Sequence, residues 1–205
     1  MRDIKKVNTA FNRVRNELCE LGLLDDGVYL DEIELIIHWI PGVGEAGFVF
    51  DSGVPWIGKV VGYEEGVIYL PWNTSHEMYV PGGTLVDTIR HEFAHAWAWL
   101  DREFIDRRWF KQAFGRSYDS QWNFGKSLWR LFLKQPDEFK QSPYYREFVS
   151  EYAMFSPYED FAETFMMCLR YRGSLDRFRS RPGVYQKVTA VHEAIGVAAS
   201  ELGDG

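Results

Sequence analysis

The sequence predicts an α+β fold, with a small mixed or antiparallel sheet in its first half and a mostly helical second half. Three runs rich in β-branched residues and bounded by turn residues predict the strands, at 31–42, 46–53 and 66–73. Two runs with helical periodicity and capping residues predict the main helices. At 205 residues with 46% hydrophobic content, the chain can bury one substantial core. We therefore expect a single domain over residues 1–205.

The chain begins with an amphipathic helix. Apolar residues recur at intervals of three and four, at Ile4, Val7, Phe11, Val14 and Leu18. This spacing lays one apolar stripe along a helix that ends near Gly22 and packs against the core.

Two of the strands contain residues that bear on the site. Pro71 lies within 66–73, and because proline cannot donate to a sheet ladder, we expect this segment to be an edge strand beside the helix that follows. The alternative is a plain core strand. His38 lies in the strand at 31–42. A lone histidine in a strand is typically a structural group, so we leave His38 out of the site.

Helices follow the strands. Thr84 can cap a helix that runs without a breaker over 85–104, and residues 101–150 are dense in aromatics and mostly helical in pattern. A second capped helix spans 156–173, with Ser156 as cap, Pro157 at its first position and Gly173 as terminator. A last helix covers about 184–202.

Composition disfavours several partners. The formal net charge of −7 repels phosphate backbones and anionic membranes, so we expect neither nucleic acid nor membrane as a partner. Cys19 and Cys168 lie far apart, without the spacing of a redox or thiolate pair. Charges interrupt every apolar run near the N-terminus, so we expect a soluble cytoplasmic protein. Export by a route without a signal, as a toxin, stays open.

The segment IRHEFAHAW carries the chemistry. His91 and His95 stand four positions apart, on one face of the predicted helix, where both imidazoles can reach one metal ion. Glu92 is rotated by about 100° from His91, where it can act as general base on a water molecule. The alternative is a polar helix face with two solvated histidines.

A zinc site of this type needs a third protein ligand. His192 is followed four positions later by Gly196, so it cannot form a second pair, and we read it as a surface residue. Glu159 is the better candidate for the ligand. The alternative is a capping box, because the four residues that begin at Ser156 match S-x-x-E.

A further carboxylate is expected to accept a hydrogen bond from the free ring nitrogen of one histidine and so fix its tautomer. Glu163 lies one helical turn after Glu159, and we prefer it for this role. Asp160 and Asp87 are the rivals.

HEFAH and EDFAETF together resemble the zincin metallopeptidases, specifically the gluzincin branch. The second motif is similar to those of anthrax lethal factor-like and MtfA-like peptidases. The resemblance implies a compact zincin-like domain, one Zn²⁺ per chain, and substrate bound along an edge strand. It also implies that Tyr152, seven residues before Glu159, stabilises the oxyanion; the alternative is an ordinary core tyrosine. The second motif departs from the thermolysin-type N-E-x-x-x-D form, which leaves the subfamily open.

We therefore expect a zinc-dependent metallopeptidase that hydrolyses a protein or peptide substrate, with Glu92 as general base. The alternatives are a catalytically weak or inactive zincin-like binding or assembly protein, and a zinc hydrolase of a non-peptide amide. The oligomeric state is left open. Aromatic residues between the motifs either line a substrate cleft or belong to the core; they include Trp97, Trp99, Trp109, Trp122 and Trp129.

Overall fold

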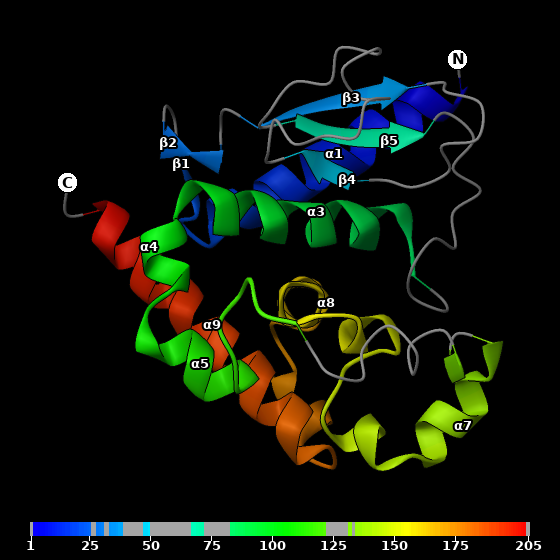
Figure 1. Cartoon of the computed structure of the whole chain (residues 1–205). Helices are drawn as coiled ribbons and strands as arrows, with labels where there is room; N and C mark the ends of the chain where they lie inside the picture. Colours follow the sequence, from blue (N-terminus) through cyan, green and yellow to red (C-terminus); the bar gives the residue numbers. More distant parts are fainter. Residues whose placement is uncertain are drawn as a thin grey trace. The chain divides into compact units, whose positions relative to one another are not determined.

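The structure is a computed structural model of the whole chain (Figure 1). It describes residues 2–25, 28–30, 33–38, 47–49, 67–71, 83–121, 131–132 and 134–203. The chain divides into two compact units, Met1–Leu100 and Asp101–Gly205, which are described in turn. The single domain expected over 1–205 stays a prediction.

Helix α1 (Arg2–Glu20) opens the first unit. Val7, Val14 and Leu18 of the predicted stripe are buried, whereas Ile4 in the first turn is 40% exposed. The helix ends before Gly22, whose φ of 71° lies in the left-handed region that glycine adopts without strain. The sequence therefore predicted this helix, its end and its buried face, except that Ile4 in the first turn is exposed.

A mixed sheet forms from β3 (Glu34–His38), β4 (Gly47–Val49) and β5 (Val67–Pro71). In the described part of the chain β5 is the middle strand, parallel to β3 and antiparallel to β4. The edge position predicted for 66–73 is therefore wrong, and β4 is the edge strand. Pro71 is tolerated because it is the last residue of β5, beyond the part that pairs with β4.

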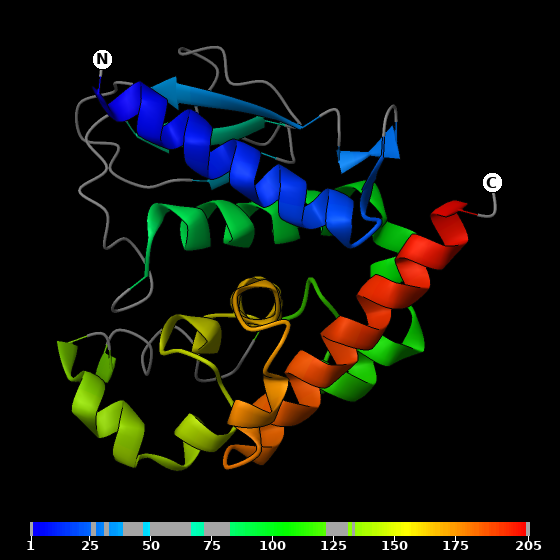
Figure 2. The ribbon, with the colours of Figure 1, turned by 180° about the vertical axis from the view of Figure 1, so that it is seen from behind.

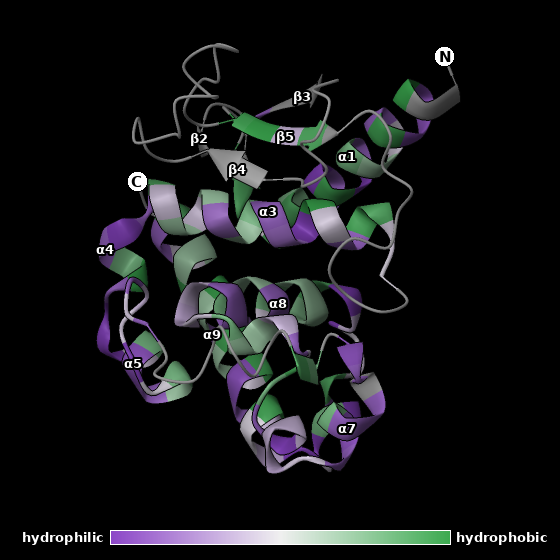
Figure 3. Cartoon of the chain, turned by 45° about the vertical axis from the view of Figure 1, so that its right-hand side comes forward, coloured by the Kyte–Doolittle hydropathy of each residue, from purple (hydrophilic) through white to green (hydrophobic). Residues whose placement is uncertain are grey.

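Strand β5 has the burial of a central strand. Its residues from Val67 to Leu70 are all buried, so both faces of the strand are covered. Figure 3 shows β5 as strongly hydrophobic. A two-stranded antiparallel ribbon of β1 (Leu24–Asp25) and β2 (Val28–Tyr29) follows α1.

Helix α3 (Leu85–Leu100) carries the HExxH motif and packs against α1, β4 and β5. Thr84 caps it as predicted: its hydroxyl accepts from the Asp87 amide at 3.3 Å, and its own amide donates to Asp87 Oδ2 at 2.9 Å. The predicted helix over 85–104 is broken at Asp101, which caps a separate short helix, α4 (Arg102–Ile105).

A partly buried ion pair joins α1 to α3, which lie side by side in Figure 2. The Arg90 guanidinium donates to both carboxylate oxygens of Glu17, at 2.8 and 2.7 Å, and to Asp87 Oδ1 at 2.7 Å. Burial alone would raise the pKa of Glu17, but the hydrogen bonds and charge of Arg90, with those of Arg13, lower it. The pair thereby fixes the rotation of the motif helix against α1.

The second unit is mainly helical, as predicted for this half of the chain. After α4 its elements are α5 (Arg108–Phe114), α7 (Pro136–Gln141), η2 (Pro143–Arg146), η3 (Tyr152–Met154), α8 (Pro157–Arg170), η4 (Leu175–Phe178) and α9 (Pro182–Gly203). Helix α8 packs against η3, α5 and α9. Among the described residues, no helix has both the length and the apolar character needed to cross a membrane.

Aromatic residues form much of the interior of the second unit. Phe161 on α8 is fully buried, with the rings of Phe110, Phe114 and Tyr118 within 6.0 Å of it, centroid to centroid. Trp109 also contacts Phe161, with centroids 6.3 Å apart. The first three rings therefore belong to the core, whereas Trp109 is half-buried and also lines a surface pocket beside α9.

The other tryptophans of the predicted aromatic block differ in their burial. Trp97 on α3 is fully buried, whereas Trp99 is 37% exposed. Trp122 and Trp129 lie outside the described residues.

Helix α8 begins where the sequence predicted and ends earlier. Ser156 accepts a hydrogen bond from the Glu159 amide, and Pro157 occupies the first helical position. The last helical residue is Arg170, and Tyr171 rather than Gly173 forms the cap, because the Tyr171 amide bonds to the Met167 carbonyl. The predicted terminator is therefore wrong by two residues.

Candidate metal centre

The two histidines of α3 lie at the spacing of metal ligands. Their Nε2 atoms are 3.2 Å apart, and both side chains are buried, 5% exposed for His91 and 7% for His95. Two nitrogens bound to one tetrahedral zinc ion at about 2.0–2.1 Å would be about 3.3 Å apart. This separation matches that of two nitrogen ligands on one zinc ion, and the burial contradicts the alternative of two solvated histidines.

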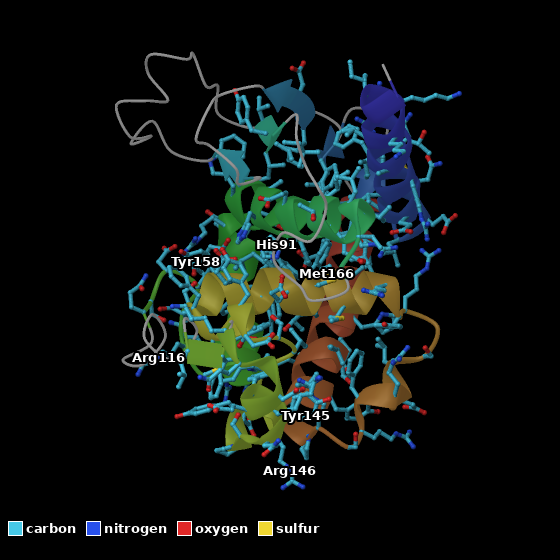
Figure 4. The ribbon with its side chains drawn as sticks, turned by 90° about the vertical axis from the view of Figure 1, so that its right-hand side faces the viewer. His91, Arg116, Tyr145, Arg146, Tyr158 and Met166 are labelled. Carbon is cyan, nitrogen blue, oxygen red and sulfur yellow. The ribbon has the colours of Figure 1, made fainter. Side chains whose placement is uncertain are left out.

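The sequence around the motif explains why these side chains are held. Ile89, Phe93, Ala94 and Trp97 of α3 are each fully buried, so apolar packing fixes the helix on several sides. This packing fixes the rotation of α3 about its axis, and so the direction in which the polar residues of the motif project. Figure 4 labels His91 on this helix.

Glu92 is also buried, at 3% exposed, next to His91 on the same helix. A buried carboxylate is costly unless hydrogen bonds or a cation compensate its charge. Burial of an acid beside two histidines is thus more typical of a functional site than of a solvated helix face.

In the second unit, Glu159 lies in the first turn of α8 and is 6% exposed. Its backbone amide donates to Ser156 Oγ at 3.3 Å, so the capping interaction exists. Its carboxylate accepts a hydrogen bond from the Tyr152 hydroxyl at 2.9 Å. The cap therefore uses the amide of Glu159, and the carboxylate is engaged elsewhere.

Tyr152, in η3, is only half-buried and has an identified polar partner, unlike an ordinary core tyrosine. Its ring stacks on Phe155, with centroids 6.1 Å apart. The hydroxyl is thereby placed against Glu159. Whether it also reaches an oxyanion stays a prediction.

Glu163 lies one turn along α8 from Glu159 and is fully buried. Its Oε2 accepts a hydrogen bond from Ser150 Oγ at 2.7 Å, and Ser150 Oγ in turn accepts from the Ala153 amide at 3.1 Å. The hydrogen bond expected from a histidine ring N–H to Glu163 stays a prediction.

The two rivals of Glu163 already have strong partners. Asp87 bonds to Thr84 and Arg90 at the start of α3. Asp160 accepts from Lys187 Nζ at 2.6 Å. Burial raises the pKa of Asp160 to about 6, although the Lys187 charge opposes the rise. The preference for Glu163 over these two rivals stays a prediction.

Two further tyrosines lie near Glu159 and were not anticipated from the sequence. Burial, together with the charge of Glu159, raises the pKa of Tyr118 and of Tyr158. Both hydroxyls are therefore neutral at physiological pH. No local sequence signal marks Tyr118, because it reaches this region only through packing against α8.

Of the other histidines, the structure describes the side chain of His192 alone. His192 on α9 is exposed, as predicted. His38 ends β3, and its side chain lies outside what the structure describes.

His91 and His95 of the first unit and Glu159 of the second are buried residues of the types that hold metal ions. The donor set comprises two imidazole nitrogens and one carboxylate oxygen, which is a set that zinc prefers and which leaves a fourth coordination position open. The residues therefore fit the cofactor that the sequence predicts.

The comparison with known protein families agrees with this prediction. Residues 60–194 match the family described as "Putative zinc-binding metallo-peptidase". Because this match covers more than half of the chain and includes the histidine pair and Glu159, the chain belongs to that family. Comparison with curated proteins and with solved structures gave no match.

Proposed function

We propose that the protein is a zinc-dependent peptidase in which His91, His95 and Glu159 hold one zinc ion per chain. The observation that carries the proposal is the 3.2 Å separation of the two Nε2 atoms on α3. Membership of a family described as zinc-binding peptidases supports it. The gluzincin assignment is part of this proposal, because it rests on Glu159 as third ligand.

A zinc ion bound by this donor set polarises a carbonyl group and lowers the pKa of water to about 7. Glu92 takes the proton from the attacking water and delivers it to the leaving amine. A general base of this kind contributes about 10²–10⁴-fold to the rate. Its burial keeps bulk water from competing for the carboxylate.

In this proposal, Tyr152 and Glu163 assist the zinc ligands and the reaction. The Tyr152 hydroxyl is a neutral donor for the oxyanion that forms on the substrate carbonyl, and its hydrogen bond to Glu159 orients that carboxylate. Glu163 accepts the N–H of one imidazole and keeps its Nε2 free for the metal. The substrate is a protein or peptide.

Two measurements on the purified chain test the proposal. The first is metal content after exhaustive dialysis, expected at one zinc per chain. The second is cleavage of a diverse peptide library, expected to stop with a zinc chelator and to return when zinc is added back. A chain that binds no zinc would refute the proposal, and a chain that binds zinc but cleaves only a non-peptide amide would refute its substrate class.

A further inference from the structure

Residues 145–154, here called the strap, run from the second half of η2 to the end of η3 in the second unit and hold two carboxylates of α8. Tyr152 donates to Glu159 at 2.9 Å, and Ser150 donates to Glu163 at 2.7 Å. The position of the strap therefore determines how both side chains are oriented.

The strap is in turn held through its backbone by Arg181, just before α9. The guanidinium donates from Nε to the Tyr145 carbonyl at 2.6 Å, and from its terminal nitrogen to the Val149 carbonyl at 3.3 Å and to the Phe148 carbonyl. Tyr145 is labelled in Figure 4. An irregular segment needs such donors, because it has no helix or sheet partners for these carbonyls.

Lys187 on α9 makes the connection that matters most for Glu159. Its Nζ donates to the Glu147 carbonyl of the strap at 2.7 Å and to Asp160 Oδ2 at 2.6 Å. The same ammonium lies 4.2 Å from the centroid of the Phe148 ring. One buried cation therefore links α9, the strap and the residue next to Glu159.

A glycine allows this close approach. Gly183 lies one turn before Lys187 on the same face of α9. A Cβ at this position would lie 2.2 Å from Glu147 Oε2 and 3.0 Å from Glu147 Cα. Any other residue would force the Glu147 side chain aside and would press on the backbone of the strap at Glu147.

The energetics favour a positional role over a stabilising one. Lys187 is 6% exposed and Asp160 is fully buried, so desolvation of the pair offsets most of its attraction. Apolar residues of similar size would stabilise such a core equally well. Apolar residues would not, however, supply the directional hydrogen bonds that connect the Glu147 carbonyl to the Asp160 carboxylate.

We propose that Lys187 is a positioning residue for the metal site: through Asp160 and the Glu147 carbonyl it fixes the strap and the first turn of α8, and so the carboxylate of Glu159. The inference rests on the proposed function, in which Glu159 is a zinc ligand. It assigns to Lys187 no contact with metal or substrate.

The test compares zinc affinity with folding. Lys187→Met alone leaves Asp160 buried without its cation and is expected to unfold more easily. The double variant Lys187→Met/Asp160→Leu removes both charges and is expected to keep the melting temperature of the wild-type apoprotein. Its zinc dissociation constant, measured by competition with a chromophoric chelator, is expected to rise about 10–100-fold. Lys140→Met is the matched control, because Lys140 pairs with Asp137 on the exposed surface.

A folded double variant with wild-type zinc affinity would overturn the inference. Should the double variant not fold, Lys187→Arg replaces the compact ammonium by a planar fork that cannot make both hydrogen bonds in the same way. Weaker zinc binding by the folded Lys187→Arg variant then supports the inference, and unchanged binding overturns it. If the wild-type chain itself binds no zinc, the proposed function is overturned as well. This measurement distinguishes failure of the proposed function from failure of the inference about Lys187.

Turnover provides a second readout. Loss of Glu159 orientation is expected to lower kcat at saturating zinc while leaving KM for the peptide nearly unchanged. A purely structural defect would instead reduce the amount of active protein without changing the apparent zinc affinity.

Discussion

The Tyr152 hydroxyl donates a hydrogen bond to Glu159 Oε1 at 2.9 Å, across seven residues of the chain. One oxygen of the proposed ligand is thereby held by a neutral donor. The phenol then has two possible partners during turnover, the carboxylate and the oxyanion of the substrate.

Removal of this hydroxyl is expected to affect both metal and turnover. In Tyr152→Phe, kcat should fall about 100-fold through loss of an oxyanion donor, and zinc affinity should fall about tenfold through loss of the carboxylate's partner. Both quantities are measured on one preparation, with Tyr144→Phe as control. A variant that equals the wild type in both would remove Tyr152 from the site.

Truncation of any proposed ligand is expected to remove the metal. His91→Ala, His95→Ala and Glu159→Ala should each lose zinc on dialysis, because two remaining protein ligands form a poor zinc site. Metal analysis checks this, and His192→Ala, which changes an exposed histidine on α9, should keep a full equivalent. Stoichiometric zinc in Glu159→Ala would show that the third ligand lies elsewhere.

The general base is expected to be separable from the metal. Glu92→Gln should retain one zinc per chain, since the amide keeps the shape of the side chain, yet lose about 10²–10⁴-fold in kcat. Steady-state kinetics with metal analysis tests this, and Glu103→Gln on the exposed side of α4 is the control. Full activity in Glu92→Gln would exclude this residue as the base.

The ion pair between α1 and α3 predicts a pH-dependent contribution to stability. Because the pKa of Glu17 is lowered in the folded chain, its contribution is present above its unfolded pKa of about 4.3 and is lost as the pH falls through the folded pKa. Glu17→Gln should therefore lower the free energy of unfolding by about 1.5–3 kcal/mol at pH 7.

Urea titrations at several pH values measure this difference, which should shrink as the pH falls below about 4. Glu20→Gln, an exposed change on the same helix, should leave the free energy of unfolding nearly unchanged. A difference between wild type and Glu17→Gln that is independent of pH would mean that the loss is one of packing rather than charge.

The two free cysteines should react very differently. Cys19 is exposed on α1, whereas burial raises the pKa of the Cys168 thiol to about 12. Since the thiolate is the reactive form, iodoacetamide at pH 8 should modify one cysteine in the folded protein and two in denaturant. Mass spectrometry of the intact chain counts the adducts, and rapid double labelling without denaturant would contradict the burial of Cys168.

Local signals in the sequence predicted the close histidine pair and the helix starts well. The four-residue spacing of His91 and His95 determines their common face on any helix, and Thr84 and Ser156 form the caps expected of them. These interactions depend on residues within one turn of each other. Sequence alone is sufficient for such contacts.

Contacts between distant segments were not predictable in this way. The central place of β5 depends on pairing with β3 and β4, and Pro71 misled the prediction because it lies at the end of the ladder. Lys187 meets Asp160 across 27 residues, and no pattern near either residue indicates it. The break at Asp101 did carry a signal, since aspartate is a preferred cap.

The preset spacing of the two imidazoles also bears on which ion the protein acquires. A rigid nitrogen pair discriminates weakly among first-row divalent ions, and affinities for such ligands rise from manganese to copper, with copper above zinc. Occupancy by zinc would then reflect which ion the surroundings supply. Protein isolated on a nickel resin would be expected to carry nickel in place of zinc until the metal is stripped and exchanged.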